Sequence, residues 1–268
     1  MFSTSGFSDN SEDVSATYSE GQQPSIGLAQ SPEANRGGGF PLLFDSGPLV
    51  TSAGTGLNGE DESVLQTTSL GMNILGAGAQ SSGATDNRVA DDFEAIHGGW
   101  QLEEIVVYAY QTGEVASTIT GVTLQIWDGF PGDVGSSVVF GDNTTNVLTS
   151  TAFSGILRVT EESTGTADNR QITANVITIG TFLPEGTYWV DYQFTGSGAS
   201  GPWAPPITII GQTTTGNGIQ QINATSPDWN PYLDSGTNTQ QGFPIQYYGT
   251  EPDLIFEDGF QTVVVPPR

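Results

Sequence analysis

From Phe40 onward the sequence consists of short apolar runs separated by glycine, proline, asparagine and aspartate, and this pattern limits the fold more than any other feature. About ten runs have the length of strands, at a spacing typical of β-sandwiches. No segment of helical length repeats its apolar residues every 3.6 positions. The pattern predicts an all-β protein: an antiparallel, jelly-roll-like sandwich that forms one domain over residues 40–249.

Two runs show how the strands should be oriented. In residues 100–113, WQLEEIVVYAYQTG, consecutive apolar residues occupy both faces, so this strand is predicted to be buried on both sides. In the run that ends in WDG at residues 127–129, apolar and polar residues alternate, which predicts that Val122, Leu124 and Ile126 point inward.

The two ends of the chain differ from this pattern. Residues 1–39 are polar and low in complexity and are predicted to form an N-terminal extension. Residues 250–268 form a C-terminal tail with two β-prone runs, and such runs are suited to pairing with the edge of a sheet, either their own or a neighbour's. The predicted assembly residues of the tail are Leu254, Ile255, Phe256, Val263, Val264 and Val265.

The charge balance excludes several kinds of partner. The chain has 30 acidic residues, five arginines and no lysine, with a net charge of −25. Nucleic acids and anionic membrane surfaces require basic residues, so neither is an expected partner. No apolar run has the length of a membrane span. Without cysteine, the chain has no disulfides or thiolate ligands, whereas the excess of carboxylates favours divalent cations.

The loop at residues 126–146 is the first candidate for a metal site. Asp128, Asp133, Asp142 and Asn143 lie among glycines, and calcium prefers carboxylate and carbonyl oxygens. The spacing differs from that of an EF-hand. Asp-Gly and Pro-Gly pairs are also typical of turns. The sequence therefore leaves three interpretations open: a turn, a calcium loop, or a loop that contacts a ligand.

A second acidic segment, NRVADDF at residues 87–93, contains Asp91 and Asp92. Adjacent carboxylates on a strand point to opposite faces, so at most one can enter a site on the core side. Calcium is the predicted ion, and Arg88 is the predicted ion-pair partner on the surface. His97 is the only histidine, and the glycines beside it predict a turn at the surface.

Aromatic residues in proline-rich loops are candidates for ligand binding. Trp203, Trp229 and Tyr232 could stack on sugar rings, or they could cap the ends of the core. Trp127 and Trp189 lie inside strand patterns and are interpreted as structural. No residue is predicted to be catalytic, because no nucleophile elbow occurs and no carboxylate pair stands out.

Two segments resemble parts of known families. LPEGTYWVDYQF, residues 183–194, resembles a strand of secreted bacterial jelly-roll domains and of pre-peptidase C-terminal-type domains, which often read Leu-Pro-x-Gly-x-Tyr-x-Val. DLIFEDGFQ is similar to a C-terminal motif of exported gammaproteobacterial proteins, but it departs from that motif at Gln261. These resemblances imply a β-sandwich at the bacterial cell surface or outside the cell, and no particular activity.

Three hypotheses about function follow. The first is a non-enzymatic extracellular structural or adhesive subunit that binds further copies of itself and assembles into filaments by pairing terminal strands. The second is a carbohydrate-binding module that contacts extracellular polysaccharide. The third is a glycoside-acting enzyme on the same fold.

Overall fold

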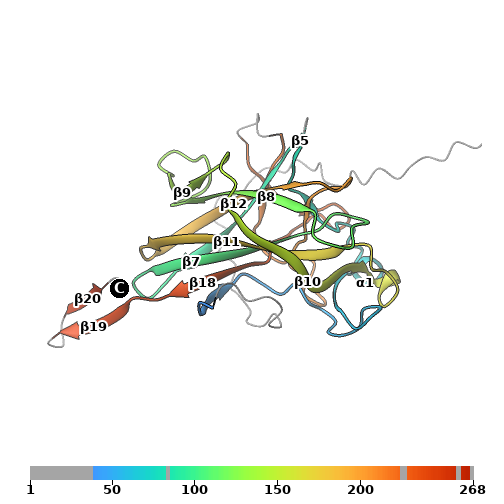
Figure 1. The fold of residues 1–268 in the computed structure, drawn as a ribbon, viewed down its shortest axis with the longest axis horizontal. Helices are drawn as coiled ribbons and strands as arrows, with labels where there is room; N and C mark the ends of the chain where they lie inside the picture. The colour runs from blue at the N-terminus through green and yellow to red at the C-terminus, as the bar shows by residue number, and fades with distance from the viewer. Residues whose placement is uncertain (1–38, 83–84, 224–227, 258–260, 266–268) are drawn as a thin grey trace, which may run out of the picture.

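The computed structural model describes residues 39–82, 85–223, 228–257 and 261–265. Two six-stranded sheets pack face to face, which confirms the predicted all-β sandwich (Figure 1). The strand order is β1-β18-β7-β11-β10-β2 in the first sheet and β15-β14-β6-β12-β8-β9 in the second. Within these described ranges, no helix has the length and apolarity needed to cross a membrane.

The strands of the first sheet are β1 (Leu42–Asp45), β2 (Asp61–Leu65), β7 (Trp100–Ala109), β10 (Leu148–Thr160), β11 (Gln171–Leu183) and β18 (Ile245–Thr250). Those of the second sheet are β6 (Arg88–Ala95), β8 (Ile119–Trp127), β9 (Val138–Asp142), β12 (Gly186–Gly196), β14 (Ile219–Gln221) and β15 (Asn230–Pro231). Four short pairs complete the strands: β3 (Ala77–Gly78) with β13 (Trp203–Ala204), β4 (Ser81–Ser82) with β5 (Thr85–Asp86), β16 (Leu233–Asp234) with β17 (Thr239–Gln240), and β19 (Asp253–Glu257) with β20 (Gln261–Val265). The helices are α1 (Thr67–Leu70) and the 3-10 turn η1 (Glu161–Ser163).

The connections follow a jelly roll. Antiparallel pairs are nested along the chain: β8 with β9 innermost, then β7 with β11, β6 with β12, and β1 with β18 outermost. Successive pairs fall alternately in the two sheets, which is the arrangement of a wrapped double Greek key. Strand β10 is an addition to this plan, and it joins β11 to β2, which runs parallel to it.

Strand β7 is buried on both faces, as its sequence predicts. Ile105 and Val107 point into the main core between the sheets. Val106 and Tyr108 point to the other side, into a second apolar cluster that long loops cover. The inward orientation predicted for β8 is also confirmed, since its inward-facing residues Val122, Leu124 and Ile126 lie in the main core.

A buried arginine holds the loops that cover the first sheet. Arg158, on β10, is 1% exposed. Its Nε donates to the backbone oxygen of Leu75 at 2.9 Å, and one terminal nitrogen donates both to Ser63 Oγ at 3.0 Å and to Thr208 Oγ1 at 2.8 Å. Burial lowers the pKa of Arg158 to about 10, so it stays protonated at neutral pH. One side chain thus joins β10 to three segments that are distant in the sequence.

We expect Arg158→Ala to lower the free energy of unfolding by about 3 kcal/mol or more, because several buried acceptors lose their donors. Arg158→Lys should also be destabilising, since an ammonium cannot reproduce the planar fork of donors. Urea denaturation measures both effects. Val134→Ala serves as the control: Val134 is fully exposed, and the change should shift stability by less than about 0.5 kcal/mol. An Arg158→Ala variant as stable as this control would contradict the assigned role.

Candidate functional site

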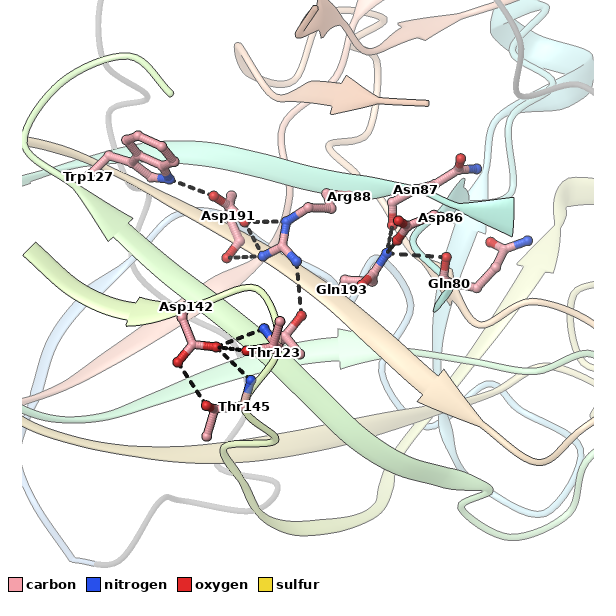
Figure 2. Close-up of polar contacts among 11 residues, drawn as sticks. Gln80, Asp86, Asn87, Arg88, Thr123, Trp127, Asp142, Thr145, Asp191 and Gln193 are labelled. Carbon is pink, nitrogen blue, oxygen red and sulfur yellow. Dashed lines mark hydrogen bonds and ion pairs between the residues drawn. The ribbon is translucent and has the colours of Figure 1, made fainter. Parts of the chain in front are cut away.

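The outer face of the second sheet carries a buried ion pair (Figure 2). Arg88 on β6 and Asp191 on β12 are 3% and 1% exposed. The Nε of Arg88 donates to Asp191 Oδ1 at 2.6 Å, and a second guanidinium nitrogen contacts the same oxygen. The third nitrogen donates to Thr123 Oγ1 on β8 at 2.9 Å. A single side chain therefore links the three adjacent strands at the centre of this sheet.

The same carboxylate fixes the orientation of a tryptophan. Trp127 Nε1 donates to Asp191 Oδ2 at 2.5 Å (Figure 2). Asp191 lies opposite Ala90 and Gln125, so Arg88 and Trp127 are its diagonal neighbours on the flanking strands, within reach of long side chains. Burial raises the pKa of Asp191, while Arg88 and the indole N–H act in the opposite direction. The charge is satisfied on both oxygens.

Aromatic rings gather around this ion pair. We call Trp127, Phe130, Trp189 and Trp229 the aromatic face; they pack over the fully buried Ala90 and Ile219. Phe130 meets Trp189 edge to face, with ring centroids 5.1 Å apart. Trp189 is nearly buried, whereas the other three rings are half-buried and so present part of their surface to solvent.

Polar side chains border the aromatic face. Gln125 is half-buried and lies opposite Asp191 on β8, and Thr187 is exposed two residues before Trp189 on the same face of β12. Partly exposed aromatic rings next to amides and hydroxyls can bind a ligand that has both apolar C–H groups and hydroxyls. This face is therefore a candidate binding surface.

The sequence pattern alone does not predict this face. It indicates a structural role for Trp127 and Trp189, and it predicts that Arg88 pairs on the surface with Asp91 or Asp92. That pairing is wrong, because Arg88 is buried with Asp191, 103 positions away in the sequence. The alternation in TYWVDYQF could have predicted this orientation. Tyr188, Val190 and Tyr192 point into the core, so Trp189 and Asp191 between them point outward.

The three aromatic residues predicted to bind a ligand lie in different places. Trp229 belongs to the aromatic face. Trp203 is half-buried on the outer side of the first sheet, where its Nε1 donates to Ser200 Oγ at 2.9 Å. Tyr232 is 2% exposed in the main core, with its ring stacked on Phe243 at 5.2 Å. The structure therefore does not bring the three rings together.

The strand pair β8–β9 separates the four loop residues predicted to bind calcium. Asp128 and Asp133 lie in the loop before β9, whereas Asp142 ends β9 opposite Leu124 and Asn143 follows it. Four strand positions, about 13 Å, separate Leu124 from Asp128. Among the described residues, no three histidine or acidic side chains converge on one point. Calcium binding at either end of this pair stays a prediction.

The carboxylates of this loop accept hydrogen bonds from turns. Asp128 Oδ1 accepts from the backbone N of Ser137 at 2.6 Å. Asp142 Oδ1 accepts from the backbone N atoms of Thr144 and Thr145 at 2.7 and 2.6 Å, and the Asp142–Thr145 contacts appear in Figure 2. Hydrogen bonds from the hydroxyls of Thr144 and Thr145, together with these backbone contacts, hold the pKa of Asp142 well below its usual value. The stretch forms turns, as one of the three interpretations predicted.

Asp91 and Asp92 point to opposite faces of β6, as predicted. Asp91 is fully buried on the core side, where its Oδ2 accepts from the backbone N of Phe243 at 2.6 Å. Asp92 lies on the outer side, opposite Trp189 on β12. Burial, followed by the charge of Asp92, raises the pKa of Asp91 well above its usual value.

Two further predicted positions lie at the end of the sandwich near the tail. His97 has φ +56° in an exposed turn, as expected, and its Nδ1 is 2.7 Å from Glu251 Oε1. The six predicted assembly residues lie in β19 and β20, which pair with each other. Leu254 lies opposite Val264, and Ile255 lies opposite Val263.

Comparison with known proteins adds no assignment to this geometry. No family model, no curated protein and no solved structure matches the chain.

We expect Asp91→Asn to flatten the dependence of stability on pH above about pH 5. The raised pKa of Asp91 means that the folded state keeps a proton that the unfolded chain releases above about pH 4, so this contribution to stability is lost as pH rises. The wild type should lose up to about 1.4 kcal/mol per pH unit from this group. Urea titrations at several pH values measure the difference.

Asp142→Asn is the matched control for this experiment. The lowered pKa of Asp142 keeps it ionised in both states over the same pH window, so its removal should leave the slope unchanged. An Asp91→Asn variant with the wild-type slope would show that Asp91 does not retain its proton in the fold.

We expect Asp191→Ala to cost about 3–5 kcal/mol of stability, because it leaves the Arg88 charge buried without a partner. Replacing both partners, as Arg88→Met with Asp191→Leu, should cost less than the single change, since no charge is then buried. Guanidinium denaturation of the three proteins measures both effects. A double variant at least as unstable as the single variant would contradict a buried and isolated ion pair.

Proposed function

We propose that the protein is a non-enzymatic extracellular adhesive domain that binds neutral polysaccharide at the aromatic face. The observation that carries this proposal is the set of half-buried rings of Trp127, Phe130 and Trp229 on the outer face of one sheet. The extracellular location rests on the resemblance to secreted bacterial domains.

The chemistry of sugars supports this choice of ligand. The C–H side of a pyranose ring packs on an aromatic ring, and its hydroxyls need polar partners in the same plane. Gln125 and Thr187 supply such partners next to the rings. The hydrogen bond from Trp127 to Asp191 holds the indole in one orientation before any ligand arrives, which reduces the entropy lost on binding.

The charge of the chain favours neutral glycans over acidic ones. At a net charge of −25, polysaccharides that carry carboxylates or sulfates are repelled. Stacking on aromatic rings does not depend on ion pairs, so binding should change little when salt is added.

We propose binding without catalysis at this face. The carboxylate at its centre, Asp191, is buried and already accepts hydrogen bonds from Arg88 and Trp127. Filament assembly through terminal strands stays a prediction. Residues 1–38 lie outside the described residues, and in the tail β19 pairs with β20.

We expect Trp127→Ala and Trp229→Ala each to weaken retention on an insoluble neutral polysaccharide by about tenfold, the loss of about 1.4 kcal/mol of stacking. The measurement is depletion of the purified protein from solution by microcrystalline cellulose, chitin, insoluble xylan and granular starch. Trp203→Ala is the matched control, because this tryptophan is also half-buried but packs on the other sheet.

Thermal unfolding of each variant separates loss of binding from loss of the fold. The proposal requires that a variant is retained more weakly on the polysaccharide while its melting temperature stays unchanged. Wild-type protein that none of the four polysaccharides retains would overturn the proposal, and so would equal retention of the Trp127→Ala and Trp203→Ala variants.

A further inference from the structure

The C-terminal hairpin extends away from the sandwich. Strand β19 begins three residues after β18 ends, and β19 and β20 form a two-stranded sheet of their own (Figure 1). Asp253 pairs with Val265 at its base, and Glu257 pairs with Gln261 next to its turn. The two β-prone runs of the tail thus pair with each other, and no other described strand pairs with either of them.

This hairpin has two open edges. Each strand uses one edge for its partner and leaves the backbone N–H and C=O groups of the other edge available to a further strand. An isolated two-stranded hairpin is marginally stable in water, and a sheet of more strands is considerably more stable. Addition of strands at an open edge would therefore stabilise the hairpin.

The two edges differ in charge. Strand β19 carries Asp253 and Glu257, whereas β20 has the sequence QTVVV, with no charged residue and no proline. Charged residues and proline are the usual protection of an edge against pairing, and β-branched residues favour it. The chain has a net charge of −25, but β20 itself has no charged residue. Two copies that meet through β20 therefore add no repulsion between charges on the pairing strands.

We propose that two copies of the protein pair through β20, antiparallel to each other, and form a four-stranded sheet across a two-fold axis. A strand that pairs antiparallel with its own copy satisfies this symmetry, because the same edge serves both partners. The arrangement closes on itself and produces a dimer. It does not depend on the polysaccharide proposal.

Two further features support a second copy as the partner. The five residues of β20 extend for about 17 Å, which exceeds the Debye length of about 8 Å at physiological salt, so the hairpins hold the two acidic sandwiches apart. Strand β1, at an open edge of the first sheet, is a poorer partner. Pro41 precedes it, and its pairing is irregular between Leu42 and Phe44.

Cysteine crosslinking tests the proposal on the full chain, which has no cysteine of its own. Thr262→Cys, Val263→Cys and Val264→Cys are oxidised with diamide and compared by non-reducing electrophoresis. At the two-fold axis a residue lies opposite its own copy, at a Cα distance of about 4.5–5.5 Å that permits a disulfide. We expect covalent dimers to peak at one position, or at two neighbouring ones, and to be several-fold more abundant than for Val139→Cys, an exposed control on edge strand β9.

Sedimentation of variants without cysteine provides a second test. Val263→Pro and Val264→Pro each remove one backbone N–H of β20. In one variant the lost N–H points toward β19, and in the other it points toward the open edge, so both variants should abolish the dimer. Val263→Thr keeps the N–H and should retain the dimer. About 1 M NaCl, where the Debye length is about 3 Å, should strengthen the wild-type dimer. Three results would each overturn the proposal: a wild type that is monomeric at both salt concentrations, crosslinking no higher than that of Val139→Cys, or proline variants that dimerise like the wild type.

Discussion

The buried guanidinium of Arg158 is the interaction on which much of the architecture depends. Long loops cover the first sheet, and the chain has no cysteine to fasten them with disulfides. Arg158 instead donates to Leu75, Ser63 and Thr208, all neutral acceptors. Burying the guanidinium charge is costly in free energy, and the hydrogen bonds that it donates offset this cost only while the acceptors stay in place. Leu75, whose backbone oxygen accepts from Arg158, itself packs against the second apolar cluster beside β7.

Arg88 has a corresponding role on the other sheet, with a different partner. Its fork reaches Asp191 and Thr123, so it joins three strands where a lysine could supply only a point charge. Asp191 then uses its second oxygen to orient Trp127. The ring positions of the aromatic face are thus linked to an ion pair buried beneath them. A weakened pair would be expected to disturb the binding surface and the sheet together.

Local alternation was sufficient to predict the all-β fold and the two buried faces of β7, because a period of two is a property of each strand alone. It was not sufficient to predict which outward-facing residues meet. Arg88 finds Asp191 through strand pairing across 103 positions, which no local pattern encodes. Tyr232 was a candidate either for ligand binding or for capping the core, and it is buried in the core against Phe243. Trp127 and Trp189 were recognised as strand residues, and only the sheet order reveals that they share an outer face.

The two proposed surfaces share a physical character that connects them. Both the aromatic face and β20 provide uncharged contact on a molecule whose net charge of −25 opposes most encounters between copies. A surface of a few half-buried rings binds a single sugar chain weakly, since little of the ligand is enclosed. A dimer presents two such faces to one polysaccharide, and the second contact then forms within a complex, where the effective concentration of the site is high. Pairing through the hairpins would in this way convert weak stacking into adhesion without any change in the binding face.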